Sequence, residues 1–492
     1  MIDKPSVDWF ALSPVLIMLG ASGLALMAAV LVPQRLRKPF GALICAAGFA
    51  GALVAAALVY ADTETARSIV AGAMQRDRFG ALAQMIVAGS GFLAVLISYG
   101  ERRRGRHEGE YYALLAAAGA GMAFLVAASN LMTLFLALEW FSIALYVLCA
   151  IDVDLAGSLE AGLKYLVIGS FGSAALLFGS ALVYGATGEL GFREIAQATS
   201  EGGLADDGLL LAGLAMIIAG LAFKASAAPF HMWTPDVYEG SPTPVSAFMS
   251  AATKAVALVL TLRVLVTAFP QEEELWTISA AVIACISLAI GNLGALRQQN
   301  VKRLLAYSSV SHAGFLLIGV VAYSELGGRA LLYYLIPYTA MSLGAFAVVA
   351  ARERELGKAV RLDDLAGFGW ERPLLGIAMW VFMLGFAGFP PTGGFLGKFL
   401  IFSAAHESGW TWLVIVGVAA TALSLPYYLG VVRAMYMRSP QALRLAPAGG
   451  SPPPEQLLSA AVVIALAVTV GSFFAVQPLT DLARDAASSL PF

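Results

Sequence analysis

Four of the eight lysines lie within long apolar stretches of the chain: Lys164, Lys224, Lys254 and Lys398. Glu139 occupies a fifth such stretch. A charged side chain near the centre of a bilayer costs roughly 2.5–3.5 kcal/mol on insertion scales, so such groups face a protein interior or a hydrated cavity and mark ion or proton paths. These residues therefore predict movement of protons or cations through a membrane.

Lys224 and Lys254 lie too deep in their stretches for the ammonium group to reach the membrane surface easily. Each is either a proton carrier or one half of a structural ion pair, and we favour the carrier. Burial disfavours the charged form of a lysine and a nearby carboxylate favours it, so a lysine beside such a partner can be switched between holding and releasing a proton. Glu139, in the middle of its stretch, is the expected partner.

Two further cations lie nearer the ends of their stretches. Lys164 follows Glu160 by one helical turn, so an ion pair at the membrane surface competes with a functional role for Lys164. We favour the functional role. Arg263 lies near the outer end of its stretch, and we expect its guanidinium group to extend to the surface.

Two histidines lie in apolar surroundings. His312 is flanked by the hydroxyls of Ser308, Ser309 and Ser311, which can order water beside it. Because histidine titrates near neutral pH, a proton relay is as good an interpretation as a core histidine with satisfied hydrogen bonds. His231 follows a proline in its stretch, and we expect it to bind backbone carbonyls that the proline frees.

Apolar residues make up 59% of the chain and charged residues 13%, against roughly 45–50% and 25% in soluble domains. This composition predicts a polytopic membrane protein and gives no support for nucleic-acid binding. Cys45, Cys149 and Cys285 stand singly, so neither a metal site, an iron–sulfur cluster nor a disulfide framework is expected. The first residues lack a basic segment and a cleavage site, so we expect the first apolar run to be retained.

Windows of about 20 apolar residues predict membrane-spanning helices. We find fourteen, joined by connections too short or too polar to hold a domain with its own core. The predicted fold class is therefore an all-α polytopic membrane protein. The windows cover residues 12–32, 40–60, 79–99, 111–129, 130–150, 158–184, 208–229, 243–268, 276–296, 302–323, 330–351, 373–405, 411–436 and 457–476.

Basic residues concentrate in alternate connections, and connections of that kind face the cytoplasm. An even number of spans places both termini on one side, which is then the periplasmic side. The basic residues concerned are Arg35, Arg37, Lys38, Arg102, Arg103, Arg104, Arg106, Arg297, Lys302, Arg303, Arg352, Arg354, Lys358, Arg361, Arg438 and Arg444.

Two windows contain prolines beside a lysine. Pro229 follows Lys224, and the pair Pro390 and Pro391 precedes Lys398. A proline removes a helical hydrogen bond and frees carbonyls that neighbours or water must satisfy. Broken helices at matching positions in two halves predict an inverted repeat with its ion site near the membrane midplane.

Four stretches of the sequence resemble the antiporter-like subunits of respiratory complex I, and the similarity runs along nearly the whole chain. They are LALEWFSIALYVL, PFHMWTPDVYEGSPTPVSAFMSAATKA, VKRLLAYSSVSHAGF and GFPPTGGFLGKFLIF. The resemblance implies fourteen helices, with helices 7 and 12 broken. It also implies an N-terminal part (1–110), two inverted five-helix repeats, helices 4–8 (111–268) and 9–13 (276–436), and a last helix with the C-terminus (457–492).

The same resemblance implies that the chain translocates protons across a bacterial inner membrane, coupled to NADH oxidation and quinone reduction elsewhere in the complex. It expects no cofactor in this chain, with flavin and iron–sulfur clusters in other subunits. The expected partners are the antiporter-like subunit M, the small subunit K and the lipid bilayer. The resemblance implies that Glu139 and Lys224 form a coupling pair and that Lys164 modulates Lys224. It further implies that Lys254 is the central relay, that His312 lines the hydrated axis, and that Lys398 passes the proton on to the periplasmic side.

Two alternatives remain open. A subunit of an Mrp-type cation/proton antiporter would share the fold and most of the charged residues. A structural spacer in a membrane arm would need no buried charges, and the cost of inserting them argues against it.

Overall fold

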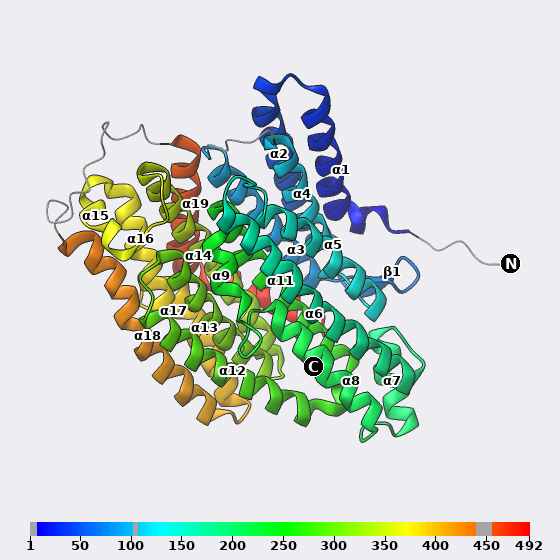
Figure 1. Ribbon diagram of the computed structural model, residues 1–492. Helices are drawn as coiled ribbons and strands as arrows, with labels where there is room; N and C mark the ends of the chain where they lie inside the picture. The colour runs from blue at the N-terminus through cyan, green and yellow to red at the C-terminus, as the bar shows by residue number, and fades with distance from the viewer. Residues whose placement is uncertain (1–6, 102–106, 439–454) are drawn as a thin grey trace.

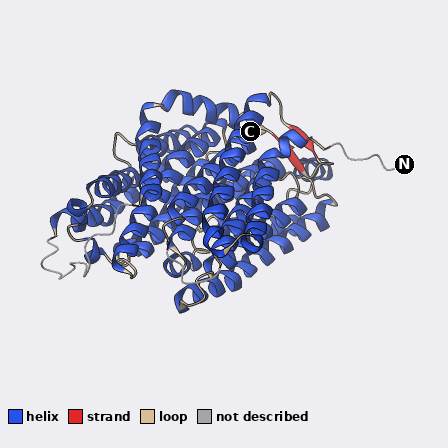
Figure 2. Cartoon of the chain, turned by 90° about the horizontal axis from the view of Figure 1, so that it is seen from above, coloured by secondary structure: helices blue, strands red, loops and turns tan. Residues whose placement is uncertain are grey.

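The computed structural model describes residues 7–101, 107–438 and 455–492, and nearly all of them are helical (Figure 1, Figure 2). The helices of the first half are α1 (Trp9–Leu31), α2 (Gln34–Asp62), α3 (Arg78–Ser98), α4 (Glu108–Leu125), α5 (Leu131–Cys149), α6 (Ala156–Thr187), α7 (Phe192–Gly202), α8 (Gly208–Lys224), α9 (Trp233–Gly240), α10 (Thr243–Phe248), the π-helix η1 (Met249–Thr253) and α11 (Lys254–Ala268). The second half contains η2 (Pro270–Glu272), α12 (Glu273–Leu296), α13 (Val301–Val321), α14 (Glu325–Leu356), η3 (Leu362–Leu365), α15 (Phe368–Glu371), α16 (Pro373–Ala387), α17 (Gly393–Glu407), α18 (Thr411–Met437), α19 (Gln456–Phe474) and α20 (Val476–Ala487).

Within the described residues, 11 helical segments are long and apolar enough to cross a membrane. They coincide with eleven of the fourteen predicted windows. The other three windows hold shorter helices for visible reasons. α4 carries Glu108 and Glu110 in its first turn, and the chain leaves helical conformation after Lys224 in α8 and after Ala387 in α16.

The centre of the bundle is formed by residues 243–268, α13 and α14. The apolar windows of these three segments are 100%, 94% and 89% buried, whereas those of α6, α18 and α19 are 33% buried. Figure 1 shows α11, α13 and α14 in the middle of the molecule, with α18 along one edge. The candidate lysine Lys254 therefore belongs to the centre of the bundle, and the outer helices offer apolar faces to lipid or to other subunits.

Small residues let helices approach closely in the bundle. Gly179 of α6 and Gly213 of α8 face each other, and a Cβ atom built on Gly179 would lie 2.7 Å from the carbonyl oxygen of Gly213. A Cβ atom built on Gly213 would lie 2.8 Å from the carbonyl oxygen of Gly179. Any larger side chain at either position would push the two helices apart, as expected where membrane helices associate through small residues.

Several elements lie outside the predicted windows, among them the short helices α9, η2, η3 and α15. An antiparallel hairpin, β1 (Arg67–Ile69) with β2 (Met74–Arg76), joins α2 to α3. The helices α7 and α20 are short and polar on one side, so a search for long apolar windows passes over them. The predicted basic positions Arg102, Arg103, Arg104, Arg106 and Arg444 lie outside the described residues.

The expectation for Arg263 is wrong. Its side chain is 1% exposed, and its two terminal nitrogens donate to the two carboxylate oxygens of Asp77 at 2.6 and 2.8 Å. Asp77 also caps the start of α3 by accepting a hydrogen bond from the backbone of Gly80 at 2.6 Å. Arg263 stays inside because this carboxylate, far away in sequence, meets it there, and a two-pronged contact of this kind suits arginine.

Candidate functional site

Lys224 lies at the first break. α8 ends at this residue, and helix resumes only at Trp233 in α9. The ammonium group of Lys224, 4% exposed, donates a hydrogen bond of 2.7 Å to the hydroxyl of Ser142 on α5. Ser142 in turn donates to the carbonyl of Leu138. The break thus places a buried lysine at the C-terminal end of a half-helix, where the helix dipole favours a positive charge.

Four aromatic rings surround the same ammonium group. Their centroids lie between 5.1 and 6.0 Å from Nζ of Lys224. A cation over ring faces at such distances is attracted by the ring quadrupole, and more strongly where water is excluded. The rings belong to Phe141, Tyr146, Tyr165 and Phe223. Among the described residues, Ser142 is the one side chain that provides Lys224 with a hydrogen-bonding oxygen.

Glu139 lies one helical turn before Ser142 on α5. One of its carboxylate oxygens, Oε1, is buried and has no hydrogen-bond partner among the described residues. Its charge interacts with that of Lys224 over distance. In the described part of the chain, however, no ion pair within 4.0 Å joins the two residues. Ser142 accepts the hydrogen bond of Lys224 and lies three residues after Glu139 on the same helix, so it is a neighbour of both residues.

Lys254 lies at the junction between two kinds of helix. It is the first residue of α11, directly after the π-helix η1, and its side chain is buried. Its ammonium group donates to the backbone carbonyl of Ser309 on α13. Single π-helical turns within α-helices occur frequently at functional sites. No sequence pattern predicted η1, whereas the depth of Lys254 in its apolar stretch did predict its place in the interior.

His312 is hydrogen bonded through both ring nitrogens. Nδ1 lies 2.9 Å from the hydroxyl of Tyr334 on α14, and Nε2 lies 3.1 Å from the hydroxyl of Tyr428 on α18. The hydroxyl of Tyr428 lies 2.5 Å from that of Ser308. The imidazole is 1% exposed and interacts electrostatically with Lys254 and Lys398. On α13 it lies between Ser309, whose carbonyl accepts from Lys254, and Phe315, whose ring lies 4.2 Å from the ammonium group of Lys398.

Lys398 lies at the second break. α16 ends at Ala387 and α17 begins at Gly393. The ammonium group of Lys398 lies 3.5 Å from the carbonyl oxygen of Ala387 and 4.2 Å from the ring centroid of Phe315. The lysine thus uses a carbonyl that the end of α16 leaves free.

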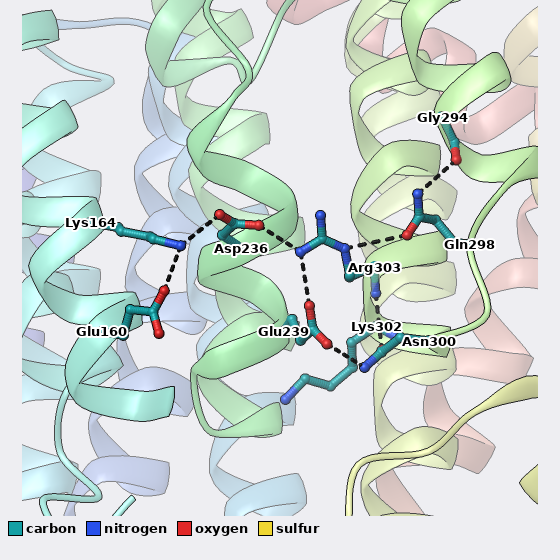
Figure 3. A network of polar contacts seen from close by, with 9 residues as sticks. All are labelled: Glu160, Lys164, Asp236, Glu239, Gly294, Gln298, Asn300, Lys302 and Arg303. Carbon is teal, nitrogen blue, oxygen red and sulfur yellow. Dashed lines mark hydrogen bonds and ion pairs between the residues drawn. The ribbon is translucent and has the colours of Figure 1, made fainter. Parts of the chain in front are cut away.

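Lys164 takes part in an ionic network at one end of the bundle (Figure 3). Its ammonium group lies 2.6 Å from a carboxylate oxygen of Glu160 and 2.8 Å from one of Asp236 on α9. Arg303 of α13 donates to the other oxygen of Asp236 at 2.6 Å and to Glu239 at 2.9 Å. The ion pair with Glu160 was one of the two roles predicted for Lys164. The contact with Asp236 was not predicted, and through it α9, the second part of the broken helix, is linked to both α6 and α13.

His231 and the cysteines suggest no ligand. His231 is 9% exposed, and its Nδ1 has no hydrogen-bond partner among the described residues. The same part of the chain contains no group of three or more histidine, cysteine or acidic residues that could hold a metal ion. Cys45, Cys149 and Cys285 are free thiols.

The candidate residues lie on helices that contact one another in order. α8 contacts α11, α11 contacts α13, and α13 contacts α17. Lys224, Lys254, His312 and Lys398 therefore lie on a series of neighbouring helices in the interior. Sequence reasoning missed Ser142, although its position three residues after Glu139 predicts the same helix face. It also missed Tyr334 and Tyr428, for which no sequence signal existed.

The arrangement of broken helices and buried lysines is that of an antiporter-like membrane subunit, and comparison with known proteins agrees. Residues 128–424 match the family described as "NADH:quinone oxidoreductase/Mrp antiporter, TM". The chain is similar to NADH-quinone oxidoreductase subunit N of Trichlorobacter lovleyi, with 42% identity over 86% of each chain. It is also similar to subunit N of Moorella thermoacetica, with 38% identity over 96% of this chain and 97% of the relative.

Solved structures give the same result. A chain of respiratory complex I from Thermus thermophilus is similar at a TM-score of 0.79 and 31% identity, over 96% of this chain and 99% of that chain. The Mrp complex from Dietzia shares the fold at a TM-score of 0.83 but only 21% identity, over 98% of this chain and 97% of that chain. The chain belongs to the NADH:quinone oxidoreductase/Mrp antiporter family and, within it, to the N subunits of the complex I membrane arm.

Proposed function

We propose that this subunit carries protons from the cytoplasm to the periplasm along Glu139, Lys224, Lys254, His312 and Lys398. One observation supports this most strongly. Of the four buried lysines, Lys224, Lys254 and Lys398 donate to the neutral oxygens of Ser142, Ser309 and Ala387, and none of the three has a carboxylate within 4.0 Å among the described residues. The fourth, Lys302, lies 3.8 Å from a carboxylate oxygen of Glu353. The buried arginines Arg76, Arg263 and Arg352 each lie in an ion pair instead.

The difference separates proton carriers from structural ion pairs. A buried ammonium group without a carboxylate partner is costly, whereas the neutral amine is not. Such a lysine changes its protonation state when a charge moves nearby. Arginine retains its proton and needs its partner permanently. We infer that Lys224, Lys254 and Lys398 exchange protons, and that Lys164 adjusts Lys224 through the network around Asp236.

We further propose that the subunit has fourteen membrane spans and two inverted repeats, residues 111–268 and 276–436. The two helix breaks support it, since one falls in each repeat beside a buried lysine. The bias of basic residues supports periplasmic termini, and hence the direction of transport.

The neighbours are proposed to be subunits K and M. Glu139 is partly buried and lies in an exposed apolar stripe of α5. A carboxylate facing lipid is costly, so this stripe is expected to meet another subunit. The exposed residues of the stripe are Met132, Leu136, Ile143 and Val147. The chain itself is proposed to hold no cofactor, and a flavin or iron–sulfur absorbance spectrum from the purified subunit would contradict this.

The test of the function is replacement of Lys224 in the assembled complex. Lys224→Ala and Glu139→Ala are expected to lower NADH-driven proton pumping in proteoliposomes strongly, because each removes one charge and leaves the other without its counterpart. Lys224→Arg is expected to be less harmful because it keeps the charge. Lys358→Ala, at a half-exposed lysine outside the path, is the control. Normal pumping by an assembled Lys224→Ala complex would favour the structural spacer instead.

A further inference from the structure

Two tyrosine hydroxyls and one serine hydroxyl form an unbroken chain of hydrogen bonds with His312. The order is Ser308, Tyr428, His312, Tyr334, with successive distances of 2.5, 3.1 and 2.9 Å. The four residues come from α13, α14 and α18. Each is at most 2% exposed, so bulk water does not compete for these hydrogen bonds.

Every member of this chain can both donate and accept. A hydroxyl has one proton and two lone pairs, and a neutral imidazole donates from one ring nitrogen and accepts at the other. The chain therefore has two self-consistent polarities. In one, protons point from Ser308 toward Tyr334 and the imidazole is protonated at Nδ1. In the other, they point back toward Ser308 and the imidazole is protonated at Nε2.

These hydrogen bonds lie along the part of α13 that contacts both lysines. Ser309, next to Ser308, provides the carbonyl that accepts the hydrogen bond of Lys254. Phe315, three residues after His312, has its ring centroid 4.2 Å from the ammonium group of Lys398. The ring of Tyr334 packs on the backbone of Gly397, the residue before Lys398, so closely that a Cβ atom on Gly397 would lie 2.2 Å from it.

We propose that Ser308, Tyr428, His312 and Tyr334 form a proton wire between Lys254 and Lys398. The proposal rests on the proposed function and adds side chains to its path. In one transit Ser308 accepts a proton and passes its own to Tyr428, and Tyr428 passes its own to Nε2 of His312. Nδ1 then releases its proton to Tyr334, whose hydroxyl proton leaves toward Lys398. One proton enters and one leaves, and each residue ends neutral.

The transit leaves His312 protonated at Nε2, so the wire must be reset before it carries another proton in the same direction. The ring has to turn over, or its proton has to return to Nδ1. The ring is enclosed by the aromatic rings of Phe315, Tyr334, Tyr338 and Phe386, whose centroids lie between 5.1 and 6.0 Å from its own. The wire therefore passes one proton and must be reset before it passes the next.

The protein contains a matched control for these tyrosines. Tyr333, next to Tyr334, donates to the carbonyl of Ser472 at 2.7 Å. Tyr427, next to Tyr428, does not serve as a control, because its hydroxyl interacts with that of Tyr428 as well as with Asn292. Tyr333, Tyr334 and Tyr428 are buried, and each replacement by phenylalanine removes one hydroxyl while keeping the ring. The assembled complex carrying each single variant is reconstituted in proteoliposomes, beside Lys224→Ala.

Proton pumping per NADH oxidised and its solvent isotope effect are measured for each. Tyr428→Phe and Tyr334→Phe are expected to lower pumping by about tenfold and to alter the isotope effect, because each interrupts the wire, whereas Tyr333→Phe pumps normally. Equal pumping by all three variants, or an equal loss in all three, overturns the wire. If Lys224→Ala lowers pumping in that same experiment, the proposed function survives without the wire. If Lys224→Ala also pumps normally, both fail.

Discussion

The ammonium group of Lys398 lies 3.5 Å from the carbonyl oxygen of Ala387, the last residue of α16. Lys224 is itself the last residue of α8. The two lysines stand on opposite sides of their breaks in sequence, one before and one after. In space both ammonium groups belong to the C-terminal end of the first half-helix, where free carbonyls and the helix dipole favour a positive charge.

Ser142→Ala is expected to impair proton transfer at the first break. It removes the hydroxyl that accepts from Lys224, and hydrogen bonds to charged groups contribute about 1.5–3 kcal/mol. We therefore expect pumping to fall about tenfold with assembly intact. Ser170→Ala, at an exposed serine of α6, is the control. Equal pumping by the two variants would show that the hydroxyl of Ser142 has no part in transfer.

Asp77→Asn is expected to destabilise the subunit. It keeps a side-chain cap for α3 but leaves the buried charge of Arg263 unpaired, which costs about 3–5 kcal/mol. The yield of assembled complex and its thermal inactivation measure the effect. The double variant Asp77→Asn with Arg263→Met should recover much of the loss, and Arg67→Ala, in an exposed pair, should change little. A double variant as unstable as the single one would refute this account.

Asp236→Asn is expected to uncouple α9 from its neighbours. The carboxylate is shared by Lys164 and Arg303, so its loss affects contacts to α6 and α13 at once. We expect a clear loss of coupled NADH oxidation and pumping. Glu160→Gln is the control, because Lys164 then keeps Asp236, and an exposed pair contributes about 0–1 kcal/mol. The interpretation fails if both variants lose activity equally.

Reporter fusions test the proposed topology. A periplasm-active reporter fused at Phe492 is expected to work, and a cytoplasm-active one inserted between Glu101 and His107 is expected to work. Activity of the opposite reporter at either position would reverse the orientation and the direction of proton movement. An additional fusion after Arg438, in another basic connection, checks consistency.

Local pattern was sufficient for eleven of the fourteen predicted spans and for the two breaks, because a run of apolar residues and a proline act on their own segment. It was also sufficient to place Lys254 and Lys398 in the interior. It failed where the decisive partner is distant in sequence. Arg263 is held inside by Asp77, 186 residues away. An isolated helix with an arginine near its end gives no sign of such a partner.

The same limit explains why some residues of the candidate site were not predicted from the sequence. Tyr334 lies 22 residues from His312 in the sequence and Tyr428 lies 116 residues from it, each on a different helix. In sequence they are ordinary tyrosines of apolar spans, no different from Tyr333 and Tyr427. Ser142 differs, since its spacing from Glu139 was available and would have placed it on the Glu139 face of α5.

The aromatic surroundings of Lys224 bear on ion selectivity. A metal cation such as Na⁺ gives up its hydration shell only where several oxygens replace the water. Around Lys224 the described side chains offer four ring faces and one hydroxyl within hydrogen-bonding distance, that of Ser142. A proton needs only the lone pair of the lysine nitrogen. On the proposed path, these ring-lined surroundings therefore favour a charge that arrives as a proton over a sodium ion, which needs several oxygens at once.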